Sequence, residues 1–236
     1  MVKFSNIRVA ILAGGLGTRL RPAVQDRPKV MALIHGRPFL TYLLDQINRA
    51  GLKEVVLCTG HMGKFIELEM GPSYKNLSLR YSCEREPLGT GGALRRAADA
   101  LDSDSILVMN GDSYCRFKLD EYWSFHERNN ASASLLLTFV SDTGRYGRVS
   151  LGDDHRVLGF EEKGSAKGRG WINAGVYLIR KKIISEIPDR RYVSLEKEIF
   201  PSLIGKPFCG FMNDGPFLDI GTPGDLAKAE SFMNRL

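Results

Sequence analysis

The chain has 236 residues with a formal net charge of +6, and 43% of its residues are hydrophobic. This length and composition predict a single globular domain with a packed core. No run of about eighteen apolar residues is present and few residues precede the first predicted strand, which argues against a membrane span or signal peptide and favours a cytoplasmic protein without a membrane partner.

The positive charge favours anionic ligands. Basic side chains occur in short groups mixed with acidic ones and lack an aromatic platform for stacking bases, so we expect no nucleic-acid partner. The four cysteines, Cys58, Cys83, Cys115 and Cys209, are scattered and have no Cys-x-x-Cys spacing. This pattern argues against a zinc site and against a disulfide framework.

The first predicted strand, from Ile7 to Leu12, leads into the glycine-rich stretch 12–20. Three glycines within four residues let the backbone turn closely against a ligand, and exposed amides of such a turn bind phosphate. Arg19 can donate forked hydrogen bonds to phosphate oxygens, and Lys29 can supply a point charge. The stretch therefore predicts a binding surface for a nucleoside triphosphate. The alternative is a glycine-rich turn with solvated basic residues.

Two better-known phosphate loops do not fit this stretch. The Walker spacing, Gly-x-x-x-x-Gly-Lys followed by Ser or Thr, occurs nowhere in the chain. The dinucleotide fingerprint would begin at Gly15 and Gly17, but Leu20 stands where its third glycine belongs.

Helices and strands alternate through the first half of the chain. In order we expect a helix that Pro38 opens and Gly51 closes, a strand at 55–58, a helix at 64–70, a strand at 79–83, a helix from Gly89 to about 101, and a strand at 106–109. This alternation is typical of an α/β fold with a mostly parallel sheet and helices on both faces. We assign residues 1 to about 130 to a nucleotide-binding lobe.

The pattern changes after a predicted helix at 119–130. Strands follow at 134–140, 148–151, 157–162, 171–179, 208–212 and 216–220, with little helix between the first four. We expect them to form a smaller mixed or antiparallel region, in a second lobe from about 131 to 236. Thr222 caps the last helix, and because no linker or repeat is evident, both lobes belong to one domain, 1–236.

Two aspartates follow apolar strands in the same way. Asp112 ends the strand at 106–109, and Asp219 ends the one at 216–220. In an open parallel sheet such strand ends face the ligand crevice, and Mg²⁺ prefers a few carboxylates supplemented by phosphate oxygens. Each residue alone could be a turn or capping aspartate, but their shared setting beside a phosphate loop predicts a magnesium site.

Several of these segments resemble the motifs of the sugar-1-phosphate nucleotidyltransferases. They are Gly14-Gly15-Leu16-Gly17-Thr18-Arg19-Leu20 followed by Pro28-Lys29, then 86–93, Asn110-Gly111-Asp112, Tyr146-Gly147-Arg148-Val149, Phe160-Glu161-Glu162-Lys163, 173–177 and Asp219-Ile220-Gly221-Thr222-Pro223. The resemblance runs from about Val9 to Asp225. Val30 and Gly164 replace prolines that the family usually has after the two lysines, which leaves the loop shape after Lys163 in doubt.

The resemblance implies a Rossmann-like, GT-A-like sheet and a small sugar-binding β region. The nucleotide-binding residues would be Leu12, Ala13, Gly14, Gly15, Gly17, Thr18, Arg19, Lys29, Glu86, Gly89, Thr90, Asn110 and Gly111. Those binding the sugar phosphate would be Gly147, Glu162, Lys163, Asn173 and Gly175. Arg19, Lys29 and Asp112 would be catalytic, and Asp112 and Asp219 would hold Mg²⁺.

The implied reaction is in-line attack of a sugar 1-phosphate on the α-phosphorus of an NTP, with loss of pyrophosphate. The attacking oxygen is already anionic, so no general base is needed and catalysis consists of alignment and charge neutralisation. Arg19 and Lys29 would hold the triphosphate and Lys163 the acceptor phosphate. A catalytically silent nucleotide-sugar sensor and a glycosyltransferase are the alternatives; the retained cations and aspartates favour the enzyme.

Within the family, the local motifs are most similar to D-glycero-α-D-manno-heptose 1-phosphate guanylyltransferases, although uridylyl- and thymidylyltransferases share much of the pattern. That similarity implies GTP as the nucleotide and GDP-heptose for a surface polysaccharide as the product. Guanine presents donors at N1 and N2, for which Glu86 or a backbone carbonyl near Gly89 and Thr90 could be the acceptor. The sequence does not distinguish a monomer from a homo-oligomer.

Overall fold

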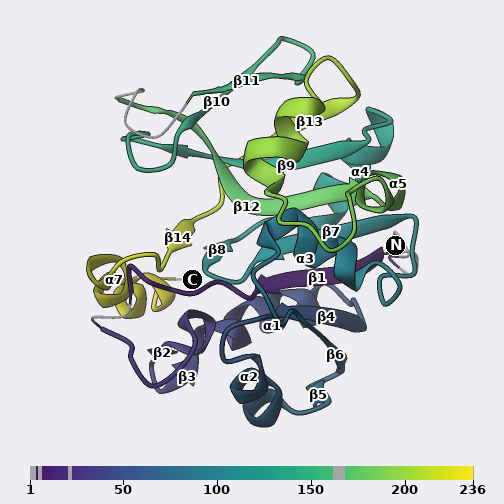
Figure 1. Ribbon diagram of the computed structural model, residues 1–236. Coiled ribbons are helices and arrows are strands. Elements are labelled where there is room, and N and C mark those ends of the chain that lie inside the picture. Colours follow the sequence, from purple (N-terminus) through teal and green to yellow (C-terminus); the bar gives the residue numbers. More distant parts are fainter. Residues whose placement is uncertain (1–3, 5–6, 21–22, 162–167, 236) are drawn as a thin grey trace.

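The computed structural model describes residues 4, 7–20, 23–161 and 168–235. Its centre is an eight-stranded mixed sheet with helices on both faces (Figure 1). Across the sheet the strands run in the order β13 (Phe208–Asn213), β9 (Ala133–Val140), β12 (Gly170–Arg180), β7 (Ser105–Asn110), β1 (Ile7–Ala13), β4 (Glu54–Thr59), β6 (Leu77–Cys83) and β5 (Ser73–Tyr74).

Strand β1 lies in the parallel part of this sheet, between β4 and β7. Its side chains alternate between two cores, so that Val9 and Ile11 pack on one face and Ala10 on the other. Burial on both faces explains why the strand is continuously apolar from Val9 to Ala13 instead of alternating. The strand therefore delivers the glycine-rich stretch to the carboxyl edge of the sheet.

Helices cover the two faces in separate groups. Residues of α1 (Phe39–Arg49), α2 (Gly63–Met70), α4 (Leu119–Arg128) and α7 (Pro223–Met233) pack in one core. Residues of α3 (Gly89–Ala97), α5 (Lys181–Ser185), the π-helical turn η3 (Leu195–Ile199) and α6 (Phe200–Ser202) pack in the other. The predicted α/β class with helices on both faces is confirmed.

Short elements complete the fold around the main sheet. They are the 3₁₀ turn η2 (Lys29–Met31) and three two-stranded ladders, formed by β2 (Leu33–Ile34) with β3 (Arg37–Pro38), β8 (Ser113–Cys115) with β14 (Phe217–Asp219), and β10 (Arg148–Leu151) with β11 (Val157–Glu161). The β10–β11 ladder lies beside the β13 edge, where an isolated bridge joins Arg156 to Cys209 (Figure 1).

The second half of the chain differs from expectation in where its strands lie. Of the first four strands predicted there, β10 and β11 form a separate small ladder, whereas β12 pairs antiparallel with both β7 and β9 and so belongs to the main sheet. Strand β13 extends the same sheet, and β14 pairs with β8 outside it. The main sheet thus continues across residue 130, and the division into two lobes there stays a prediction. The segment 181–207, for which no element was predicted, contains α5, η3 and α6.

One helix boundary was also wrong. Helix α3 ends at Ala97, not near Leu101, because the chain leaves the helix through turns in which the Leu101 amide donates to the carbonyls of Ala97 and Ala98. Within the described residues, no helix has the length and apolar character needed to cross a bilayer.

Candidate active site

A cleft of about 440 Å³ lies at the carboxyl ends of β1 and β7. Its lining includes the glycine-rich stretch from Leu12 to Arg19, Lys29, Gly89, Thr90, Asn110 and Asp112. Of the residues predicted to bind the nucleotide, Glu86 and Gly111 are the two that do not line the cleft in the described structure. Residues from four separate sequence motifs therefore meet at one place.

Backbone geometry explains the glycines of the first motif. Gly17 has a φ of +59°, in the left-handed region that favours glycine, and its carbonyl accepts from the Leu20 amide at 2.9 Å. A Cβ at Gly14 would lie 2.9 Å from the Glu84 Oε1 atom, so this position leaves little room for a side chain. The stretch can therefore approach a ligand with its backbone, as phosphate binding requires.

Gly111 supports the cleft from behind. Its amide donates to the Leu12 carbonyl at 2.9 Å, and a Cβ there would lie 2.7 Å from the same oxygen. This close approach ties the end of β7 to the end of β1 and sets the position of Asp112. Gly111 thus has a structural part in the site, and its predicted contact with the nucleotide stays a prediction.

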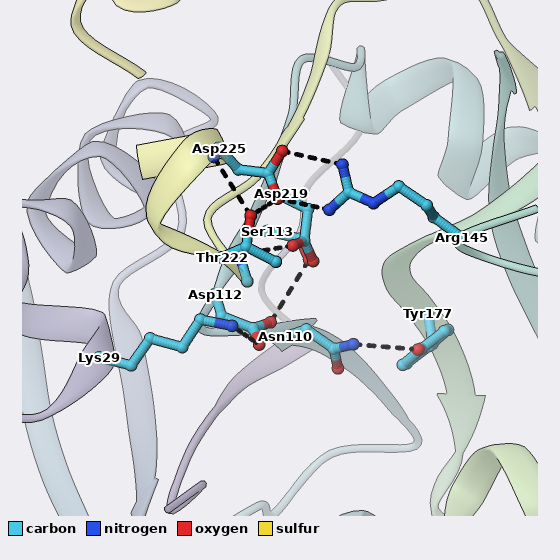
Figure 2. Close-up of polar contacts among 10 residues, drawn as sticks. Lys29, Asn110, Asp112, Ser113, Arg145, Tyr177, Asp219, Thr222 and Asp225 are labelled. Carbon is cyan, nitrogen blue, oxygen red and sulfur yellow. Dashed lines mark hydrogen bonds and ion pairs between the residues drawn. The ribbon is translucent and has the colours of Figure 1, made fainter. Parts of the chain in front are cut away.

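The two predicted metal-binding aspartates are brought together by the β8–β14 ladder, which pairs Ser113 with Asp219. The Ser113 hydroxyl lies 3.4 Å from the Asp112 Oδ1 atom and 3.4 Å from the Asp219 Oδ2 atom (Figure 2). A hydrogen bond from the Ile220 amide to the Asp112 carbonyl, at 3.0 Å, adds a backbone link. The two carboxylates therefore face one another across a single serine.

The charges around this pair suit a divalent cation. Burial, and then the negative charge of Asp112, raise the pKa of the Asp219 carboxyl above its ordinary value. Asp219 accepts from the Gly221 amide at 2.6 Å, and Lys29 is the cation in contact with Asp112. In the described chain no group of three or more His, Cys, Asp or Glu side chains forms a metal site, so a cation here would also depend on substrate oxygens.

The turn that opens α3 forms the wall predicted to face the nucleobase. Gly89 has a φ of +71°, and the Gly91 amide donates to the Val193 carbonyl at 2.8 Å. A Cβ at Gly89 would lie 2.5 Å from that carbonyl oxygen. The turn is therefore packed against a segment more than one hundred residues later in the chain, and Tyr192 of that segment lines the cleft.

The acidic residue at this wall is Glu84, not Glu86. Glu84 lines the cleft, accepts from the Leu88 amide at 3.1 Å, and has a pKa raised by burial. Glu86 is exposed. The chain turns after β6, and the Glu84 amide donates to the Thr59 carbonyl at the end of β4, which holds Glu84 at the sheet edge.

A bulge in β12 shapes the predicted sugar side. The pairing of β12 with β9 shifts between Asn173 and Tyr177, Gly175 adopts a φ of +75°, and its amide donates to the Asn173 Oδ1 atom at 2.8 Å. A Cβ at Gly175 would lie 3.0 Å from the Asn110 Nδ2 atom. The bulge thus brings two predicted sugar-binding residues next to Asn110 of the nucleotide side.

A buried polar cluster joins the two sides. The Tyr177 hydroxyl lies 3.0 Å from the Asn173 Nδ2 atom, 3.4 Å from the Asn110 Nδ2 atom and 3.3 Å from the Glu196 Oε1 atom. Glu196 in turn accepts from the Thr90 hydroxyl at 2.8 Å. Sequence reasoning did not assign Glu196, because its connection to Thr90 depends entirely on how the chain folds back.

The loop 142–147, which carries Gly147, is attached to the segment after β14. Both terminal nitrogens of Arg145 donate to the Asp225 carboxylate, one of them at 2.9 Å (Figure 2). The Tyr146 ring packs edge-on against Phe217. This ion pair holds the pKa of Asp225 below its ordinary value. Gly147 has a φ of +79°. Glu162 and Lys163, the other predicted sugar-phosphate residues, lie outside the described residues.

Comparison with known proteins agrees with this geometry. The chain is 39% identical over 225 residues to the D-glycero-alpha-D-manno-heptose 1-phosphate guanylyltransferase of Aneurinibacillus thermoaerophilus, covering 93% of this chain and 95% of that protein. It is 36% identical over 233 residues to the mannose-1-phosphate guanylyltransferase of Mycobacterium tuberculosis, covering 97% of this chain and 65% of that protein.

A similar fold is found in the crystal structure of HddC from Yersinia pseudotuberculosis, with 33% identity, a TM-score of 0.87, and coverage of 96% of this chain and 99% of that one. A second structure of HddC, complexed with GMP-PN, gives a TM-score of 0.85. The nucleotidyl transferase family model matches residues 8–235. The protein therefore belongs to the nucleotidyl transferase family.

Proposed function

We propose that this protein transfers a guanylyl group from GTP to a sugar 1-phosphate, giving a GDP-sugar and pyrophosphate. The observation that carries the proposal is the meeting of the glycine-rich stretch, Lys29, Asp112 and Asp219 in and beside one cleft. A catalytically silent sensor would not need this complete set of charges.

The chain's own residues supply alignment and charge. Backbone amides of the glycine-rich stretch, with Arg19 and Lys29, bind and orient the triphosphate. Asp112 and Asp219 hold Mg²⁺, which when bound neutralises negative charge on the reacting phosphates. Gly147, Asn173 and Gly175 contact the sugar, and Lys163 binds its phosphate. No residue needs to remove a proton, because the attacking phosphate oxygen is already anionic.

We propose that Glu84 recognises guanine through hydrogen bonds. A carboxylate accepts two hydrogen bonds side by side, which matches the N1 and N2 donors of guanine and no pair of donors on uracil or thymine. Glu84 lines the cleft beside Pro87 and Gly89. A base without these donors would leave the half-buried carboxylate with the Leu88 amide as its donor and without the base's two hydrogen bonds, so the site should discriminate strongly.

The acceptor that we propose first is D-glycero-α-D-manno-heptose 1-phosphate, since the chain matches a protein of that name over nearly the whole length of both. Mannose 1-phosphate is the second candidate, because the M. tuberculosis relative is named for it. Mannose lacks the outermost carbon and hydroxyl of the heptose. The product would be GDP-heptose for a surface polysaccharide, made in the cytoplasm where GTP is available.

Pyrophosphate release tests the proposal. Four NTPs should be combined with heptose, mannose, glucose and N-acetylated sugar 1-phosphates, and GTP with heptose 1-phosphate should give the highest kcat/KM. Glu84→Gln should lower the preference for GTP over UTP by about tenfold or more, because it replaces one acceptor by a donor. If no combination of substrates releases pyrophosphate, the sensor is favoured. A preference for UTP or dTTP with glucose 1-phosphate would refute the guanylyl assignment.

A further inference from the structure

Lys29 and Asp112 form an ion pair with one another. The Lys29 Nζ atom lies 2.7 Å from the Asp112 Oδ2 atom, and the lysine side chain is only 10% exposed (Figure 2). Lys29 begins the η2 turn, and its Cβ lies 3.3 Å from where a Cβ of Gly17 would be. The lysine therefore reaches the carboxylate from a backbone position that is packed against the phosphate loop.

Asp219 has no such partner. Among the described residues no lysine, arginine or histidine forms an ion pair with it, and its polar contacts are the Ser113 hydroxyl and the Gly221 amide. Among the described residues, the ammonium of Lys29 is therefore the positive charge in direct contact with this pair of carboxylates.

We propose that Lys29 is a stand-in cation: its ammonium occupies the place of the divalent cation at Asp112 until a triphosphate binds. The ammonium then leaves Asp112 and pairs with the triphosphate. This inference rests on the proposed function, in which Lys29 binds phosphate and the two aspartates bind a divalent cation. While Lys29 pairs with Asp112, it blocks one carboxylate oxygen and repels a second cation. Once Lys29 pairs with phosphate, that oxygen becomes available as a ligand.

The exchange makes metal and nucleotide binding depend on one another. If Lys29 only bound phosphate, it would not affect the affinity of the nucleotide-free protein for a metal ion. If Lys29 is a stand-in cation, it lowers that affinity. Removing the ammonium should therefore have two effects of opposite sign: tighter binding of a divalent cation to the nucleotide-free protein, and weaker binding of GTP in the presence of that cation.

The probe is Mn²⁺, whose free concentration is measured by electron paramagnetic resonance during titration of the protein without nucleotide. Lys29→Met keeps an unbranched chain of similar length and removes the charge, and it should tighten Mn²⁺ binding by about tenfold, the scale of one charge-assisted hydrogen bond. Lys29→Arg keeps the charge and should bind Mn²⁺ as the unaltered protein does. Isothermal titration with GTP and Mn²⁺ should show weaker GTP binding for Lys29→Met.

Lys75→Met is the matched control, because Lys75 also pairs with a buried aspartate, Asp45, away from the cleft. It should leave both affinities unchanged. Asp112→Asn should abolish Mn²⁺ binding. If Asp112→Asn weakens Mn²⁺ binding but Lys29→Met does not tighten it, the stand-in role is wrong and the proposed metal site stands. If Asp112→Asn binds Mn²⁺ normally, the metal site itself is wrong.

Discussion

On the nucleotide side of the cleft, the surface is formed largely by backbone that approaches closely because side chains are missing. Gly17 and Gly89 adopt positive φ, and a Cβ at Gly89 would collide with the Val193 carbonyl. On the acceptor side, the shape is held by side chains from distant segments, such as Arg145 with Asp225 and Tyr177 with Asn110.

Because of this difference, substitutions on the two sides of the cleft should have different effects. Where backbone forms the surface, adding one methyl group displaces the wall itself and should affect both folding and nucleotide binding. Where side-chain contacts position a loop, removing one contact should loosen that loop and leave the rest intact. Asp112 and Asp219 lie where the two sides meet, and their loss should affect both substrates.

The largest effect is expected there. Asp112→Asn and Asp219→Asn should each lower turnover by orders of magnitude with little change in stability, because an amide keeps the shape and loses the charge. Steady-state kinetics with a parallel melting curve measures both quantities. Near-normal turnover of either variant would remove that residue from the metal site.

Gly89→Ala tests the nucleotide side. Gly89 has a φ of +71°, and a Cβ there would lie 2.5 Å from the Val193 carbonyl oxygen. The substitution should therefore lower the free energy of unfolding by roughly 1–3 kcal/mol and weaken GTP binding. Gly159→Ala is the control, because a Cβ at Gly159 meets no atom within 4 Å. Equal stability of the two variants in denaturant titration would contradict the importance of backbone approach.

Arg145→Ala tests the acceptor side. The guanidinium is half exposed, so its ion pair with Asp225 contributes about 1 kcal/mol, and the KM for the sugar phosphate should rise roughly fivefold. The KM for GTP and the melting temperature should change little. Lys118→Ala, which breaks an exposed pair with Glu121, should have no effect on either KM. A rise in the KM for GTP instead would show that the loop serves both substrates.

The smallest effect at neutral pH concerns His126, in the helix beside the acceptor half of the sheet. Its Nδ1 atom lies 2.7 Å from the Ser134 hydroxyl, and burial lowers its pKa to about 3. The folded state keeps His126 neutral while the unfolded chain takes up a proton below about pH 6.5, so stability is present above that pH and is lost as the pH falls from there toward 3.

Between pH 7 and pH 5.5 this loss should amount to about 1 kcal/mol, and it should be smaller in His126→Asn, which cannot titrate. Denaturant titration at the two pH values measures it. An equal loss in both proteins would assign the acid sensitivity to other groups.

Much of the cleft could be predicted from local pattern. The apolar run of β1 and the glycines after it predict a buried strand followed by a tight turn, and this turn lines the cleft. Two apolar strands ending in Asp112 and Asp219 were expected to bring their carboxylates together, and the structure places them on either side of Ser113. These features depend on the order of residues along short segments, which a sequence displays directly.

Other features were decided only by the tertiary structure. Glu84 and Glu86 are two residues apart, and it is Glu84, whose amide is bonded to the end of β4, that lines the cleft. Thr90 meets Glu196 across 106 positions of sequence, and Arg145 meets Asp225 across 80. Lys29 pairs with Asp112 across 83. Periodicity and turn signals report on neighbours along the chain, whereas these side-chain pairs exist only because the fold brings distant helices, turns and loops to the same edge of the sheet.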